Sequence, residues 1–226
     1  MFGLENNYLE GVASGATQEW NPIEMWHLER MPGIEQLGIE GWNKASLEDK
    51  CSVMQNLVNR CTEIHGMEPV PLEFGNPGKG NAGIYSQDTR RITLDQKDLE
   101  NCNTIKELSH LRNTVLHETF HAYQHQCIEG KIQHSNPTEV EVWRENFRNY
   151  ITPDEDIVGY WNQPVEVSAR IFAEVHNKQI AELNGETWLN TFTDHVTTSA
   201  VEFLENNRSL WYPVMRMTAN AIKNMC

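Results

Sequence analysis

Apolar side chains recur at steps of three and four residues along much of the chain, which is the spacing of one face of an α-helix. The first such segment begins at Ser46 and the second at Thr104, and each start has an acidic residue three positions on, as in a capping box. Gly66 and Gly130 follow these segments and predict their ends. The pattern predicts five helical regions: 46–66, 104–130, one opening at 136–137, 164–183, and a last one after 185.

Between the first two helical segments the pattern changes to short alternating stretches, which favour β-strands. Residues 70–74 predict a strand that Pro71 restricts to the edge of a sheet, because proline has no backbone N–H to donate. Residues 83–86 and 91–94 flank a polar turn and predict a β-hairpin. The expected fold class is therefore α+β, mostly helical with a small antiparallel or mixed sheet.

The domain organisation predicted from these segments is simple. Glycines and prolines interrupt residues 1–45, which we expect to form an irregular N-terminal arm. Residues 46–226 contain the patterned segments and are expected to form one compact domain. A hydrophobic content of 39% in 226 residues is sufficient for one well-buried core.

Charge and composition restrict the function classes. The chain carries 18 basic and 32 acidic residues, and its formal net charge of −14 disfavours binding to nucleic acid or to an anionic membrane surface. No apolar run reaches the ~18–20 residues of a transmembrane helix, and the first residues do not resemble a signal peptide. Five cysteines, an odd number without a C-x-x-C pair, disfavour a disulfide framework. We expect a soluble, cytoplasmic protein.

The second helical segment contains an H-E-x-x-H sequence, from His117 to His121. Residues four apart lie on one face of a helix with their Cβ atoms about 5–6 Å apart, so both imidazoles can bind one Zn²⁺. Glu118 lies about 100° around the helix, beside such a metal. A carboxylate in that position can take a proton from a zinc-bound water. The sequence therefore predicts a zinc site with Glu118 as general base.

A catalytic zinc site needs a third protein ligand and one position open to water. His125 lies about 12 Å beyond His117 along the helix axis, which is too far for the same ion. Cys127 has the spacing of the third histidine in metzincins, but those proteins turn the chain with a glycine where this chain has Gln124. Glu166 is the favoured third ligand, because small residues one and two turns on would allow close packing of its helix. The alternative is a solvated carboxylate that favours the helix N-terminus.

H-E-x-x-H followed by E-x-x-A on a separate helix resembles the gluzincin branch of the zincin metallopeptidases. Residues 166–173 are similar to the E-x-x-A-x-x-F-A segment of ImmA/IrrE-like minimal metallopeptidases and of metallopeptidase toxin domains from bacterial polymorphic systems. The resemblance covers residues 83–175. It implies a zincin-like domain whose hairpin edge binds an extended peptide substrate by main-chain hydrogen bonds. It also implies the site residues: His117, His121 and Glu166 as ligands and Glu118 as general base.

Peptide hydrolysis at such a site also requires an electrophile that stabilises the developing oxyanion. Arg170 is the first choice because it lies one helical turn after Glu166, although it could equally pair with Glu174. The other candidates are tyrosines and histidines from several parts of the chain: Tyr123, Tyr160, His176 and His195.

Three functional hypotheses follow, and the first is the leading one. It is a gluzincin-like zinc metalloendopeptidase that hydrolyses a protein or peptide substrate. The second is a zinc-stabilised binding or regulatory module without turnover, in which a protein side chain closes the fourth coordination position. The third is a metal-free helical interaction protein. Within the first hypothesis, a regulatory protease and a delivered toxin both fit an acidic chain of this kind.

Overall fold

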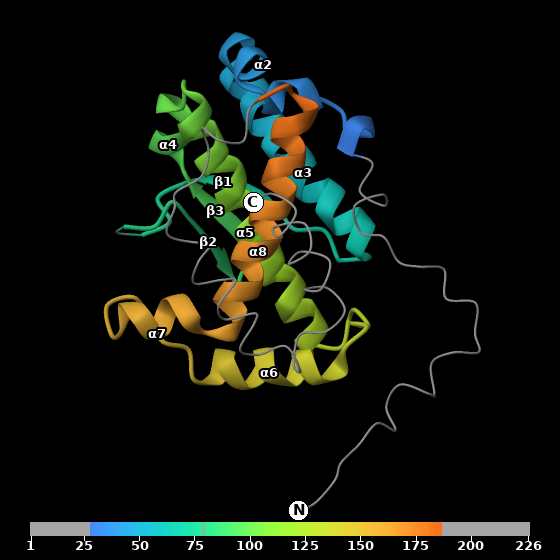
Figure 1. Cartoon of the computed structure of the whole chain (residues 1–226), viewed down its shortest axis with the longest axis vertical. Coiled ribbons are helices and arrows are strands. Elements are labelled where there is room, and N and C mark those ends of the chain that lie inside the picture. The colour runs from blue at the N-terminus through green and yellow to red at the C-terminus, as the bar shows by residue number, and fades with distance from the viewer. Residues whose placement is uncertain (1–27, 79, 187–226) are drawn as a thin grey trace, which may run out of the picture.

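A small three-stranded sheet packs against one side of a group of helices in residues 28–78 and 80–186, the part of the chain that this computed structural model describes (Figure 1). The class is α+β, as predicted. In chain order the elements are η1 (Leu28–Arg30), η2 (Ile34–Leu37), α2 (Ile39–Lys44), α3 (Leu47–His65), β1 (Leu72–Gly75), β2 (Gly83–Ser86), β3 (Arg91–Asp95), α4 (Gln96–Asn101), α5 (Ile105–Ile128), α6 (Pro137–Arg148), α7 (Ile157–Asn162) and α8 (Pro164–Leu183).

Local sequence signals set the ends of the two long helices α3 and α5. The hydroxyls of Ser46 and Thr104 accept hydrogen bonds from backbone N–H groups three residues on, and both predicted capping boxes are present. Gly66, with φ of 62°, and Gly130, with φ of 75°, adopt the left-handed conformation that ends the helices. These boundaries confirm the predictions from the sequence.

The sheet has strand order β1-β3-β2, so β1 and β2 are both edge strands. Strand β1 pairs with β3 in parallel, with Leu72 opposite Ile92, and β2 pairs with β3 as an antiparallel hairpin, with Gly83 opposite Leu94. The sheet is therefore mixed. The predicted edge strand and hairpin are both confirmed.

Helices α5 and α8 pack against each other along much of their length and form the centre of the protein (Figure 1). Ala169 and Ala173 of α8 are fully buried, and their small side chains allow this close approach, as predicted. Helix α6 lies across one end of the pair, where Phe120, Trp143 and Val165 belong to a second, smaller apolar cluster. The larger core lies between α3, the sheet and the first half of α5.

Residues 28–44 differ from the irregular arm that was expected over residues 1–45. They form the short helices η1, η2 and α2, and Leu37 and Trp42 are fully buried in the larger core. These helices are too short to show a helical repeat in the sequence. The same reason explains why α4 and α7 were not predicted. The helical region expected after residue 185, apart from Glu186, lies outside the described residues.

The described ranges contain neither a helix suited to a membrane span nor a disulfide. None of their helices combines the length and the apolar character that a membrane span requires. Their four cysteines are free thiols: Cys51, Cys61, Cys102 and Cys127.

Candidate metal centre

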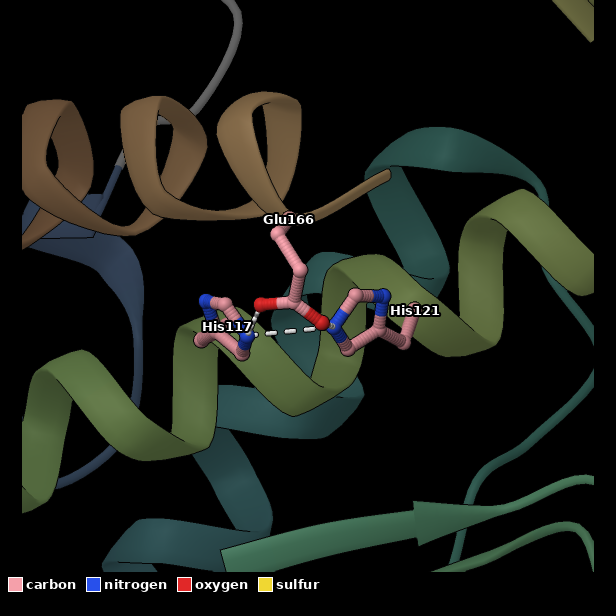
Figure 2. Close-up of side chains that lie close together, drawn as sticks. All are labelled: His117, His121 and Glu166. Atoms are coloured by element: carbon pink, nitrogen blue, oxygen red, sulfur yellow. Dashed lines mark hydrogen bonds and ion pairs between the residues drawn. The ribbon is translucent and has the colours of Figure 1, made fainter. Parts of the chain in front are cut away.

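The H-E-x-x-H sequence lies in the second half of α5, and its two histidine side chains face α8 (Figure 2). The preceding residues Val115 and Leu116 are fully buried in the larger core, which fixes the rotation of the helix. Glu166 projects from the first turn of α8 and points between the two imidazoles (Figure 2). Two helices thus bring the three predicted ligands together.

The ligand atoms of His117, His121 and Glu166 all lie within 4.8 Å of one another. The Nε2 atoms of the two histidines are 3.0 Å apart, and they lie 3.2 and 3.3 Å from the two carboxylate oxygens of Glu166. Tetrahedral donors at the usual zinc–nitrogen distance lie about 3.3 Å from one another. The three side chains therefore fit a zinc ion in both donor type and spacing.

The charges of the three side chains are strongly coupled. Burial alone would lower the pKa of His121, but hydrogen bonding to Glu166 and the charge of that carboxylate raise it to about 9. Burial alone would raise the pKa of Glu166, but hydrogen bonds from His117 and His121 together hold it well below its ordinary value. The site therefore concentrates negative charge that a proton or a metal cation can neutralise.

Glu118 lies beside this cluster and is held by the sheet. Its Oε2 accepts a hydrogen bond of 2.8 Å from the backbone N–H of Tyr85 in β2. Gly83 allows the strand to approach α5 this closely, because a Cβ at that position would lie 2.7 Å from the Thr114 side chain and 3.4 Å from Glu118. The predicted general base is thus placed between the candidate ligands and an edge strand.

Two tyrosine hydroxyls reach the same site from the chain between α6 and α8. Tyr150 donates a hydrogen bond of 2.7 Å to Glu166 Oε1, and Tyr160 of α7 interacts electrostatically with the same carboxylate. Burial, followed by the neighbouring Glu166, raises the pKa of both phenols above the ordinary value, and the charge of Glu118 acts in the same direction. Both tyrosines therefore remain hydrogen-bond donors at neutral pH, close to both carboxylates.

Arg170, the first choice for the electrophile, also lies at the site. Its Nη1 is 3.5 Å from Glu166 Oε2, its Nη2 donates to the backbone carbonyl of Trp161, and its guanidinium stacks 4.5 Å from the centre of the Trp161 ring. The alternative partner Glu174 interacts with it electrostatically. Arg170 is thus held close to Glu166 by its contacts with α7.

The remaining candidates lie elsewhere. Tyr123 bonds His134 at 2.7 Å, and His176 bonds Gln179 more than two turns along α8 from Glu166. The ring of His125 packs 4.2 Å from that of Phe147. Neither His125 nor Cys127 belongs to the cluster of ligand atoms found among the described residues. His195 lies outside the described residues.

Sequence reasoning missed Tyr150 as a site residue and considered Gln124 only as an obstacle to a metzincin turn. Tyr150 lies 16 residues before Glu166 and beyond α6, and no local spacing connects the two. Gln124 follows His121 by three residues on one helix face, a spacing that brings side chains into contact. The three-residue spacing between His121 and Gln124 was therefore the sequence signal from which this contact could have been predicted.

No protein-family profile, curated protein or solved structure matches this chain.

Three histidines that are wholly or partly buried predict that the protein loses stability in acid. Burial lowers the pKa of His65 and His125 to about 4 and that of His176 to about 3. An unfolded histidine titrates near pH 6.5, so between these values the unfolded state binds more protons than the folded state. Their contribution to stability is complete above about pH 6.5 and is lost as the pH falls through about 4. We expect the free energy of unfolding, measured in urea at successive pH values, to fall over this range.

The variant His176→Gln isolates one of these contributions. Because glutamine does not titrate, the fall in unfolding free energy between pH 6.5 and 4 should be less steep in the variant than in the parent protein under identical conditions. An equal slope in the two proteins would contradict the assignment of a neutral, buried His176.

Proposed function

We propose that this protein is a zinc-dependent endopeptidase of the gluzincin type. The observation that carries the proposal is the convergence of His117, His121 and Glu166 from two helices, with Glu118 held beside them. Two imidazoles and one carboxylate are a ligand set of catalytic zinc sites, in which the fourth position is left for water or substrate.

The residues of the site suit peptide hydrolysis. When bound, Zn²⁺ supplies Lewis-acid chemistry, because it polarises the scissile carbonyl and makes a water molecule more acidic. Glu118 is positioned to take the proton from the attacking water and to return it to the amine nitrogen of the leaving group. The hydroxyls of Tyr150 and Tyr160 are donors that can stabilise the carbonyl oxygen as it becomes negative. Arg170 is the competing candidate for that role.

The surroundings of the site support a polypeptide substrate. The N–H of Ile92 in β3 donates to the carbonyl oxygen of Pro71, the residue before β1. The opposite residue Tyr85 therefore directs its backbone groups away from β3 and toward the site. An extended peptide can add to such an edge. Four of the six exposed large hydrophobic side chains in the described residues lie on β2 or α7, the elements that contact Glu118 and Glu166: Ile84, Ile157, Val158 and Trp161. Apolar side chains of a substrate would bind there favourably.

The alternative of a zinc-stabilised module without turnover requires a closed, four-ligand site. Within residues 28–78 and 80–186 the cluster contains three ligands, which favours the catalytic hypothesis. Metal analysis and a cleavage assay separate the two. We expect the purified protein to contain zinc near one ion per chain, and cleavage of a proteome-derived peptide library to be lost on chelation and restored by zinc. Bound zinc without cleavage would favour the module, and absence of zinc would favour the metal-free hypothesis.

The tyrosine variants Tyr150→Phe and Tyr160→Phe test the electrophile. Loss of one oxyanion donor typically lowers kcat by about 10²–10³-fold. We expect a loss of this size in at least one of the two variants, with zinc content unchanged, in the same cleavage assay. A full loss in Arg170→Gln, with both tyrosine variants active, would instead assign the role to Arg170.

A further inference from the structure

Gln124 is a fully buried side chain of α5 that contacts both a metal ligand and α8. Its Oε1 lies 2.8 Å from His121 Nδ1. Its Nε2 lies 3.1 Å from the backbone carbonyl oxygen of Val165 and 2.8 Å from Ser168 Oγ. The proposed steps of hydrolysis make no use of this residue, yet it occupies the space behind His121.

The partners of Gln124 determine which way its amide points. The carbonyl oxygen of Val165 can only accept a hydrogen bond, so the amide NH₂ must face α8. The amide oxygen must then face His121, and because that oxygen can only accept, His121 Nδ1 must carry a hydrogen. The nitrogen left for a metal is Nε2, which is the atom that lies 3.3 Å from Glu166 Oε1.

The same amide also holds the third ligand in place. Val165 directly precedes Glu166 in the first turn of α8, and Ser168 lies in the same turn. The Ser168 hydroxyl already bonds the carbonyl oxygens of Pro164 and Val165, so it is oriented to accept from Gln124 Nε2. One buried side chain therefore links the position of His121 to that of the helix turn that carries Glu166.

We propose that Gln124 is a positioning residue of the metal centre. It fixes the tautomer of His121 in which Nε2 is free to bind a metal, and it holds the helix turn that carries Glu166 close enough for the carboxylate to bind the same metal. This inference rests on the proposed zinc site. Metal-binding histidines generally donate their second ring N–H to a fixed acceptor, and removal of that acceptor lowers metal affinity by about 10–100-fold. A glutamine amide three residues along the same helix performs this task here.

The experiment measures the zinc dissociation constant of the full chain by competition with a chromogenic chelator. Gln124→Met keeps the length of the side chain and removes the acceptor, so we expect zinc to bind about 10–100-fold more weakly. Gln124→Glu keeps an oxygen facing His121. Its zinc affinity should therefore fall by less than about tenfold, because about tenfold is the smallest loss expected when such an acceptor is removed. Ser168→Ala removes only a contact on the α8 side and should also stay below about tenfold.

Thermal unfolding of the metal-free variants shows that each has folded, and a spectrum of the unaltered protein provides a test that needs no variant. In ¹H–¹⁵N NMR spectra of the zinc-bound parent, His121 should carry its proton on Nδ1. Zinc bound through Nδ1 would overturn the inference. Equal zinc affinity of Gln124→Met and the parent, or an equal loss in Gln124→Glu and Gln124→Met, would overturn it as well.

The outcomes also separate this inference from the proposed function. A parent protein that does not bind zinc would overturn both. Tight zinc binding that responds to Gln124→Met as expected, in a protein that cleaves no peptide, would support the positioning role and overturn the peptidase. Tight zinc binding with full cleavage and no effect of Gln124→Met would overturn the positioning role alone.

Discussion

Glu118→Gln is expected to lower kcat for peptide hydrolysis by about 10²–10⁴-fold, which is the usual contribution of a general base, and to leave the zinc content unchanged. The glutamine amide oxygen can still accept the 2.8 Å hydrogen bond from the Tyr85 N–H, so the contact between α5 and β2 is kept. An amide cannot accept the proton of the attacking water, and the reaction should stop at that step.

The measurement is cleavage-site profiling on a mixed proteome, with zinc content determined on the same protein preparations. Glu129→Gln is a matched control, because Glu129 caps the same helix and forms surface ion pairs with Arg90 and Lys131. We expect the control to retain its activity. Turnover by Glu118→Gln equal to that of the parent would contradict the assigned mechanism, whereas loss of zinc would indicate a structural role for Glu118.

Glu186→Ala is expected to lower the free energy of unfolding by about 3–5 kcal/mol, because it leaves a buried charge without its partner. Arg112 is completely buried, and its Nη2 lies 2.9 Å from Glu186 Oε2. The second carboxylate oxygen accepts a hydrogen bond of 2.8 Å from the N–H of Ile39, the first residue of α2. Arg112 also donates to the carbonyl of Leu37 and to the side chain of Asn177. The pair thus connects α5 and α8 to the short N-terminal helices.

Urea unfolding of the parent and of three variants measures this effect. Glu182→Ala is the control, because Glu182 lies four residues earlier, is exposed and forms a surface pair with Lys178 at 3.7 Å. Its removal should cost less than about 1 kcal/mol. Replacement of both members of the buried pair, as Arg112→Met with Glu186→Leu, should recover part of the lost stability. Equal effects of Glu186→Ala and Glu182→Ala would show that the buried pair does not stabilise the fold.

The sequence was sufficient to predict helix α5 and most of the elements around it, because the relevant signals are local. The capping box at Thr104, the buried residues Val115 and Leu116, and the four-residue spacing of the histidines all act within α5. Each is an interaction between residues a few positions apart, and helix geometry converts such a spacing into a common face.

The prediction of Glu166 as a ligand depended on expected helix packing rather than on a local motif. Its position at the start of a helix with buried alanines at 169 and 173 indicated a close helix pair, and the structure places its carboxylate 3.2 Å from His117 Nε2. Helix packing follows from the pattern of small residues, but the rotation and register of α8 against α5 do not. Those depend on contacts such as the Gln124 amide with Val165, which join residues 41 positions apart.

The sequence by itself determined the long helices, the hairpin, and the residue types and spacing of the candidate metal site. Only the tertiary structure decided that Tyr150 lies against Glu166, that Tyr85 of β2 holds Glu118, and that Arg112 and Glu186 pair across 74 residues. The physical reason is the range of the interactions. Periodicity and capping are encoded within one or two helical turns, whereas these side chains meet only after the helices and the sheet have packed, and no spacing along the chain records where they meet.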